Sequence, residues 1–376
     1  MTAHAKLSAS GSSRWLNCPG SVQAESTYKY EDRGSIHAQE GTVAHELAER
    51  CLNSPKLKPT DFLNVSINDS LIKVNQDMCD AVQIYIDEIN LHSGIKFIEK
   101  RVDFSDYAPE GFGTADCIII DPPNKKMFVI DLKYGKGIRV DAIGNTQMRL
   151  YALGALADYG MIYDIDDIEM IIVQPRLDHI ESDTCTVDEL YKFGEWVKQQ
   201  AELALSDNAP RVPGEKQCEW CKHKAVCPEL LNLTQKTLMS EFDDCDPTPV
   251  NKLTDAQLRT VLDNMKLINS WLSAVEDYVK SRLEDGDEFE GYKIVEGRSS
   301  REWVNEEEVV IQLSDLYSED ELFERKFLSV AKAEKLLGKS NAHMIKDMVV
   351  KKAGKPTLVP ESDKRLSITI SSKDFD

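Results

Sequence analysis

Three short segments rich in apolar residues follow one another between residues 96 and 133, and they restrict the fold more than any other feature of the chain. They span 96–104, 114–121 and 126–133, and Pro122-Pro123-Asn124 separates the second from the third. Apolar or alternating runs of this length, bounded by Pro and Gly, are typical of β-strands. We therefore predict three consecutive strands with a tight turn between the last two.

Segments with the apolar spacing of helices lie on both sides of these strands. Residues 41–54 and 71–92 precede them, whereas 145–159 and 187–205 follow. Residues 168–174 form a further apolar run that is typical of a buried strand. The resulting α-βββ-α-β order predicts an α/β fold in which helices flank a central mixed sheet.

The chain changes character after Cys227. Thr254 and Gln257 fit a capping box, and one apolar stripe continues from there to Leu283, which predicts a long helix. A hairpin is expected around Gly291. We predict three parts, namely an N-terminal domain (1–235), a mostly helical acidic accessory region (236–354) and an extended tail (355–376).

The distribution of charge matters more than its sum. A net charge of -20 argues at first against a nucleic-acid partner, because phosphates bind Lys and Arg. Residues 284–321, however, hold 14 acidic and 3 basic residues, more than half of the excess. Residues 125–149 hold 6 basic and 2 acidic residues, so this part of the N-terminal domain is locally basic.

The first 20 residues are polar and small, unlike a signal peptide, and no apolar run approaches the roughly 18 residues of a membrane span. We therefore expect a soluble protein of the cytoplasm without a membrane partner. The sequence does not set the oligomeric state.

Two carboxylates and a lysine occupy the ends of the predicted strands. Asp116 ends Gly113-Thr114-Ala115-Asp116, and Asp131 and Lys133 follow the next apolar run. Asp131 and Lys133 share a face because strand side chains alternate with a period of two. Hard oxygen ligands suit Mg²⁺ or Mn²⁺, which polarise a phosphate and help to generate hydroxide. An Asp-x-Lys tripeptide alone is usually a solvated strand face.

Further polar residues surround this pair in the sequence. His45 lies on the predicted helix upstream, in Gly41-Thr42-Val43-Ala44-His45. Gln147 and Tyr151 are four residues apart, so they share one face of the helix downstream and could both reach the strand ends. Each of the three, taken singly, is more often an ordinary helix residue.

The ordered set of these four motifs resembles the RecB-type branch of the PD-(D/E)xK nuclease superfamily. The resemblance implies a restriction-endonuclease-like core and a metal-dependent deoxyribonuclease. It implies that His45, Asp116, Asp131 and the carbonyl of Leu132 are metal ligands. It also implies that Lys133 is the catalytic lysine, while Gln147 and Tyr151 orient the site. Asp131 stands where many members of the superfamily have Glu.

Four of the nine cysteines have the spacing of a metal site. Cys218, Cys221 and Cys227 lie within ten residues, and Cys18 is the best candidate for a fourth ligand. Spacing alone fits either Zn²⁺ or an iron-sulfur cluster, and by itself favours zinc. A proline follows Cys18 and Cys227, as in cluster-binding runs. We expect the others to be small core or surface residues, namely Cys51, Cys79, Cys117, Cys185 and Cys245.

One cysteine before the nuclease motifs and Cys-x2-Cys-x5-Cys after them resembles the iron-sulfur staple of AddB-type nucleases and of CRISPR adaptation nucleases. The resemblance implies a structural 4Fe-4S cluster that ties Cys18 to Cys218, with a zinc site as the alternative. His223 lies between two of the ligands and is expected to face solvent.

Three further segments resemble a phage and prophage family of unassigned function that carries this nuclease core. They are 8–18, 173–176 and 359–365. The resemblance implies an exonuclease that makes single strands from DNA ends in a bacterial host, for a phage single-strand annealing protein. The alternative is a catalytically silent module that uses the same fold to bind DNA or protein.

Overall fold

The computed structural model describes residues 5–27, 36–68, 70–239, 255–295, 344 and 348. The chain divides into two compact units, 1–295 and 296–376, and every helix and strand named below lies in the first.

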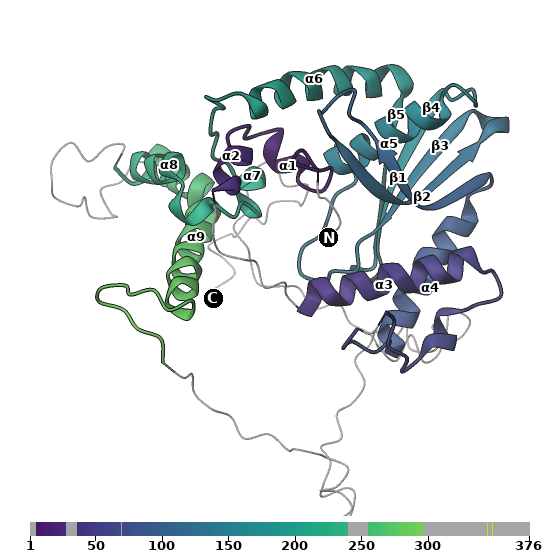
Figure 1. Ribbon diagram of the computed structural model, residues 1–376, viewed down its shortest axis with the longest axis horizontal. Coiled ribbons are helices and arrows are strands. Elements are labelled where there is room, and N and C mark those ends of the chain that lie inside the picture. Colours follow the sequence, from purple (N-terminus) through teal and green to yellow (C-terminus); the bar gives the residue numbers. More distant parts are fainter. Residues whose placement is uncertain are drawn as a thin grey trace, which may run out of the picture. The chain divides into compact units, whose positions relative to one another are not determined.

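A five-stranded mixed sheet forms the centre of this unit (Figure 1). Its strands, in spatial and sequence order, are β1 (Ile95–Asp103), β2 (Phe112–Asp121), β3 (Lys126–Leu132), β4 (Asp167–Gln174) and β5 (His179–Thr186). Neighbouring strands are antiparallel except β3 and β4, which are parallel and joined through a helix.

Helices cover both faces of the sheet (Figure 1). In chain order the helices of this unit are α1 (Ser12–Trp15), α2 (Ser21–Ser26), α3 (Ile36–Asn53), α4 (Gln76–Leu91), α5 (Thr146–Tyr159), α6 (Val187–Leu205), α7 (Glu215–Glu219), α8 (Pro228–Met239) and α9 (Asp255–Glu284). Short 3-10 turns are η1 (Pro59–Phe62), η2 (Pro122–Asn124), η3 (Pro175–Leu177) and η4 (Lys224–Val226). One buried cluster lies between the sheet and α5 and α6, and the other between the sheet and α3 and α4.

The predicted α/β class is confirmed, with a central mixed sheet, flanking helices and a helical part toward the C-terminus. The predicted helices and strands between residues 41 and 205 are all present, and η2 forms the predicted turn. The helix expected from Leu71 begins only at Gln76, because the Asn75 side chain accepts a hydrogen bond from the Met78 amide and caps it there.

Strand β5 is absent from the prediction. Its sequence, HIESDTCT, alternates but carries few apolar residues, since it is an edge strand that exposes one face. Such a strand gains its hydrogen bonds from β4 rather than from its own apolar character.

The predicted long helix is confirmed as α9, which packs against α7, α8 and η4. Gly291 has a left-handed φ of +84°, which suits the expected turn. Thr254, the second half of the expected hairpin and the tail lie outside the described residues. The domain boundary near residue 235 remains a prediction.

Candidate metal centre

Strand β3 ends with a buried carboxylate beside a lysine. Asp131 and Lys133 share a face as expected, with Lys133 Nζ 2.9 Å from Asp131 Oδ2. Asp131 is only 3% exposed. Its Oδ2 accepts no hydrogen bond of good geometry from any residue that the structure describes. A buried oxygen with spare lone pairs is therefore directed into the centre.

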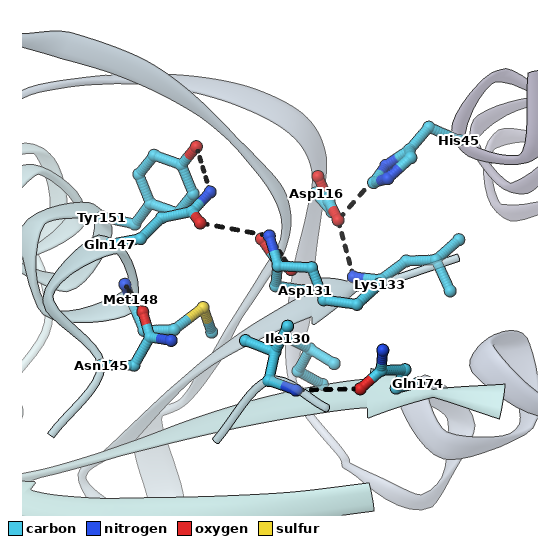
Figure 2. Close-up of polar contacts among 12 residues, drawn as sticks. His45, Asp116, Ile130, Asp131, Lys133, Asn145, Gln147, Met148, Tyr151 and Gln174 are labelled. Carbon is cyan, nitrogen blue, oxygen red and sulfur yellow. Dashed lines mark hydrogen bonds and ion pairs between the residues drawn. The ribbon is translucent and has the colours of Figure 1, made fainter. Parts of the chain in front are cut away.

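Helix α5 fixes the lysine from the other side. Lys133 Nζ donates to Gln147 Oε1 at 3.1 Å, and Gln147 Nε2 donates to the Tyr151 hydroxyl at 3.0 Å. Figure 2 shows Gln147 and Tyr151 on one helix, pointing together toward the strand ends. The helix begins there because the Asn145 side chain caps it by accepting from the Met148 amide. The chain of hydrogen bonds holds the ammonium group in one orientation.

Asp116 lies where strands β2 and β3 part. Their pairing ends at Cys117 and Ile130, and Asp116 Oδ2 accepts from the Leu132 amide at 2.7 Å in place of the next ladder bond. In an extended strand the N–H and C=O of one residue point to the same side. The Leu132 carbonyl therefore lies on the same side of β3 as its amide, the side that faces β2.

His45 approaches from the opposite layer. Its Nδ1 lies 3.3 Å from Asp116 Oδ2, and Figure 2 shows it on a separate helix, across Asp116 from Gln147. Val43, Ala44 and Leu47 anchor this part of α3 in the core. The structure thus brings together all the residues that the sequence proposed for this site.

Glu99 on β1 lies at the same centre, although the sequence does not single it out. Its Oε1 lies 3.9 Å from His45 Nδ1, and the ligand atoms of His45, Glu99 and Asp116 all lie within 4.8 Å of one another. Glu99 is one of two acids in the sequence IKFIEKRVD, and nothing in its spacing singles it out. Only the register, which places it across from Asp116, reveals its position.

Strands β1 and β2 both change face at this point. Ala115 and Ile118 lie in the same buried cluster, although strict alternation would put them on opposite faces. On β1, Phe97 and Val102 also pack into this one cluster, although they are five residues apart and strict alternation would put them on opposite faces. The matched shift keeps the two strands in register while it redirects the side chains at the centre.

The electrostatics of the centre favour a cation. Burial and the charge of Asp116 raise the pKa of Glu99 to about 7. Burial lowers the pKa of His45, but the charge of Asp116 and its hydrogen bond to the ring raise it to about 9 overall. Burial raises the pKa of Asp131 despite the nearby Lys133 ammonium. Carboxylates crowded in this way fit a divalent cation, which would offset their repulsion.

A second group with metal-ligand spacing is already satisfied by protein contacts. Asp141, His179 and Glu181 gather within 4.8 Å. Arg139 lies 3.3 Å from Asp141 and 3.1 Å from Glu181, which also accepts from the Ala142 amide at 2.7 Å. These contacts brace the loop that follows Lys133 against β5.

The four predicted cysteine ligands line one small pocket, namely Cys18, Cys218, Cys221 and Cys227. The Val212 amide donates to Cys18 Sγ at 3.2 Å, and the Gly214 amide to Cys218 Sγ at 3.4 Å. Among the described residues, no three of these sulfurs lie within 4.8 Å of one another. Burial raises the pKa of the Cys221 thiol to about 12.

The neighbours of this pocket differ in part from expectation. His223 was expected to face solvent, but it is half buried and lines the pocket, where burial lowers its pKa. Four of the remaining cysteines are buried in the core as expected, namely Cys51, Cys79, Cys117 and Cys185. Cys245 lies outside the described residues.

Gly113 makes room for the site tyrosine. A Cβ at this position would lie 2.6 Å from Tyr151 Cε1. We expect Gly113→Ala to displace the ring and to lower the free energy of unfolding by about 1–3 kcal/mol, as overpacking does. Urea denaturation measures this.

Gly41→Ala is the control for that substitution. A Cβ at Gly41 would meet no atom within 4 Å, and the residue lies inside α3, so alanine should stabilise by about 0.5–1 kcal/mol. Equal effects of the two substitutions would contradict the close approach of Tyr151.

Comparisons with known proteins name a family. The family model described as "Protein of unknown function (DUF2800)" matches residues 4–366. A solved structure titled "Crystal structure of SSO0001" aligns with 61% of this chain and 88% of its own length, at 14% identity and a TM-score of 0.28. A similarity this weak supports no statement about fold or activity. In the described part of the chain, no helix has both the length and the apolar character needed to cross a bilayer.

Proposed function

The chain belongs to the DUF2800 family, and we propose from the geometry of its own centre that it is a metal-dependent nuclease that hydrolyses phosphodiester bonds in DNA. One arrangement supports this proposal most strongly. Lys133 Nζ contacts both Asp131 and Gln147, and the contact between His45 and Asp116 lies beside them.

The ligand set suits Mg²⁺ or Mn²⁺. His45, Asp116, Asp131 and the Leu132 carbonyl would hold the ion, and the buried Asp131 carboxylate has lone pairs left beside its contact with the Lys133 ammonium. When bound, such an ion polarises the scissile phosphate and lowers the pKa of a coordinated water.

The protein supplies the remaining chemistry through Lys133. Its ammonium group is fixed by Asp131 Oδ2 at 2.9 Å and by Gln147 Oε1 at 3.1 Å, and it has a third proton to donate. That proton can orient the attacking water or offset the charge that develops on the phosphate. Tyr151 acts through Gln147, because its hydroxyl accepts the amide proton and fixes the side chain.

DNA is the substrate that the resemblance of the motifs favours. The segment 125–149 is basic in sequence, but five of its six basic side chains form ion pairs with acids, so its charge adds little to this argument. The resemblance of the motifs to RecB-type PD-(D/E)xK nucleases supports the same reaction. It also supports an exonuclease that acts on DNA ends in the bacterial cytoplasm and supplies single strands to a phage annealing protein.

The four cysteines that line one pocket could hold a structural metal group. Their spacing alone fits zinc or an iron-sulfur cluster, and the resemblance to the staple of AddB-type nucleases favours a 4Fe-4S cluster. Its role would be to join Cys18 to the segment 218–227, and no redox step is assigned to it.

End-labelled linear DNA, circular DNA and single-stranded DNA, each incubated with Mn²⁺, with Mg²⁺ or with EDTA, test the activity. We expect cleavage only with a divalent cation, and release of short end products from linear DNA before any nicking of circles. DNA binding without turnover under all metal conditions would favour the silent binding module instead.

A further inference from the structure

Glu99 occupies an unusual position in strand β1. It has a left-handed φ of +47°, a conformation that non-glycine residues rarely adopt. The pairs Ile98–Cys117 and Lys100–Ala115 flank it, so Glu99 lies directly across from Asp116, but these two form no ladder pair. Backbone strain of this kind collects at functional sites.

We propose that Glu99 is a further ligand of the divalent cation, so that three elements hold the ion through His45 on α3, Glu99 on β1 and Asp116 on β2. The inference deepens the proposed function, because it concerns the same centre, but cation binding can be measured without DNA. The three ligand atoms already lie within 4.8 Å of one another.

An independent observation points to a ligand at this place. Asp131 is 3% exposed, and its Oδ2 accepts no hydrogen bond of good geometry among the described residues. It lies next to Asp116 at the point where β2 and β3 part, and the Lys133 ammonium at 2.9 Å is its ion-pair partner among the described residues. A buried carboxylate oxygen in this state calls for a further positive charge in the same space.

A purely structural role does not account for Glu99. Its side chain is 27% exposed, its nearest ion-pair partner is His45 at the long distance of 3.9 Å, and Asp116 repels it. In the metal-free protein the side chain therefore costs stability, and so does its backbone. A ligand role accounts for a charged residue at a position where both effects oppose folding.

The mixed ligand set also favours one cation. One imidazole nitrogen beside several carboxylate oxygens suits Mn²⁺ better than Mg²⁺, since Mg²⁺ prefers oxygen ligands alone and retains its waters. We expect Glu99→Gln to weaken the binding of both ions. The ratio of the Mn²⁺ affinity to the Mg²⁺ affinity should change less, because the imidazole remains.

The test measures Mn²⁺ alone, by calorimetry and by the EPR signal of free Mn²⁺, on the full chain without DNA. Glu99→Gln should weaken Mn²⁺ binding about tenfold or more. The melting temperature of the metal-free protein should not fall. Glu99→Asn should keep or raise it, since asparagine tolerates the left-handed backbone. If Glu99 had only a structural role, its replacement would lower the melting temperature without a selective loss of Mn²⁺ affinity.

Glu46→Gln is the matched control. Glu46 follows His45 on α3, and its replacement removes the same charge while Mn²⁺ affinity should stay within about twofold. Unchanged Mn²⁺ affinity in Glu99→Gln, in a protein that cleaves DNA, would overturn this inference and leave the proposed function intact. Lost Mn²⁺ affinity in a protein that never cleaves DNA would overturn the nuclease and keep the inference.

Discussion

Asp131→Asn and, separately, Lys133→Met should each lower the rate of DNA cleavage roughly a hundredfold to a thousandfold or more, while the protein still folds. The Asp131 carboxylate is the most buried acid in the centre, and it fixes the ammonium group at 2.9 Å. Removal of a preorganised charge that acts only in the transition state has effects of this size. Single-turnover cleavage of end-labelled DNA with Mn²⁺ measures them.

Stability separates loss of chemistry from loss of fold. Each single replacement leaves the partner without its counter-ion, which costs roughly 3–5 kcal/mol in a fully buried pair. The Lys133 side chain is 26% exposed, so we expect only about 1–3 kcal/mol from urea denaturation. The double variant Asp131→Asn/Lys133→Met should be more stable than either single variant and equally inactive.

Another ion pair on the same strand provides the control. Lys126 Nζ lies 2.7 Å from Glu169 Oε2, both side chains are partly buried, and neither reaches the centre. Lys126→Met should lose some stability but keep cleavage within about twofold. If cleavage survives in Asp131→Asn and Lys133→Met while it falls in Lys126→Met, the centre has been misassigned.

The parts of this centre that local periodicity determines could be predicted from the sequence. Asp131 and Lys133 are two residues apart on a regular strand, and Gln147 and Tyr151 are four apart on a regular helix. In both cases the spacing alone sets the shared face. His45 required more, because only the core packing of α3 fixes the direction of its ring.

The contribution of Glu99 could not be predicted in this way. The alternation of β1 breaks at the left-handed residue, so a period of two assigns the wrong face to one half of the strand. Its partner across the sheet is set by the register with β2, which is a long-range property. Strand β5 escaped prediction for a related reason, since its pairing with β4 stabilises it more than its own apolar residues do.

Replacing a cysteine of the pocket should have the second large effect, a loss of bound iron and of visible absorbance. Purified without air, the protein should be brown and contain about four iron atoms per chain, as a 4Fe-4S cluster requires. Cys221→Ser and Cys18→Ser should each lose most of the iron and the visible absorbance. Cys51→Ser is the control, because Cys51 is buried in α3 outside the pocket and should leave the colour unchanged.

The effect on stability follows from the positions of the ligands. Cys18 and Cys218 lie 200 positions apart, and a cross-link across a loop this long is worth up to roughly 5 kcal/mol in the chain-entropy model. Protein contacts already join the same two segments, since the Gly20 amide donates to the Pro210 carbonyl and the Lys222 amide to Glu25 Oε1. We therefore expect Cys18→Ser to lower the free energy of unfolding by about 2–4 kcal/mol.

The rate of DNA cleavage by folded Cys18→Ser protein distinguishes a structural cluster from a catalytic one. The ligands of the cysteine pocket lie on other elements than Asp131 and Lys133, so cleavage per folded molecule at low temperature should be nearly unchanged. Colourless wild-type protein with one zinc per chain would overturn the iron-sulfur assignment and leave the cross-link in place. Full stability in Cys18→Ser, with the metal group lost, would overturn the cross-link itself.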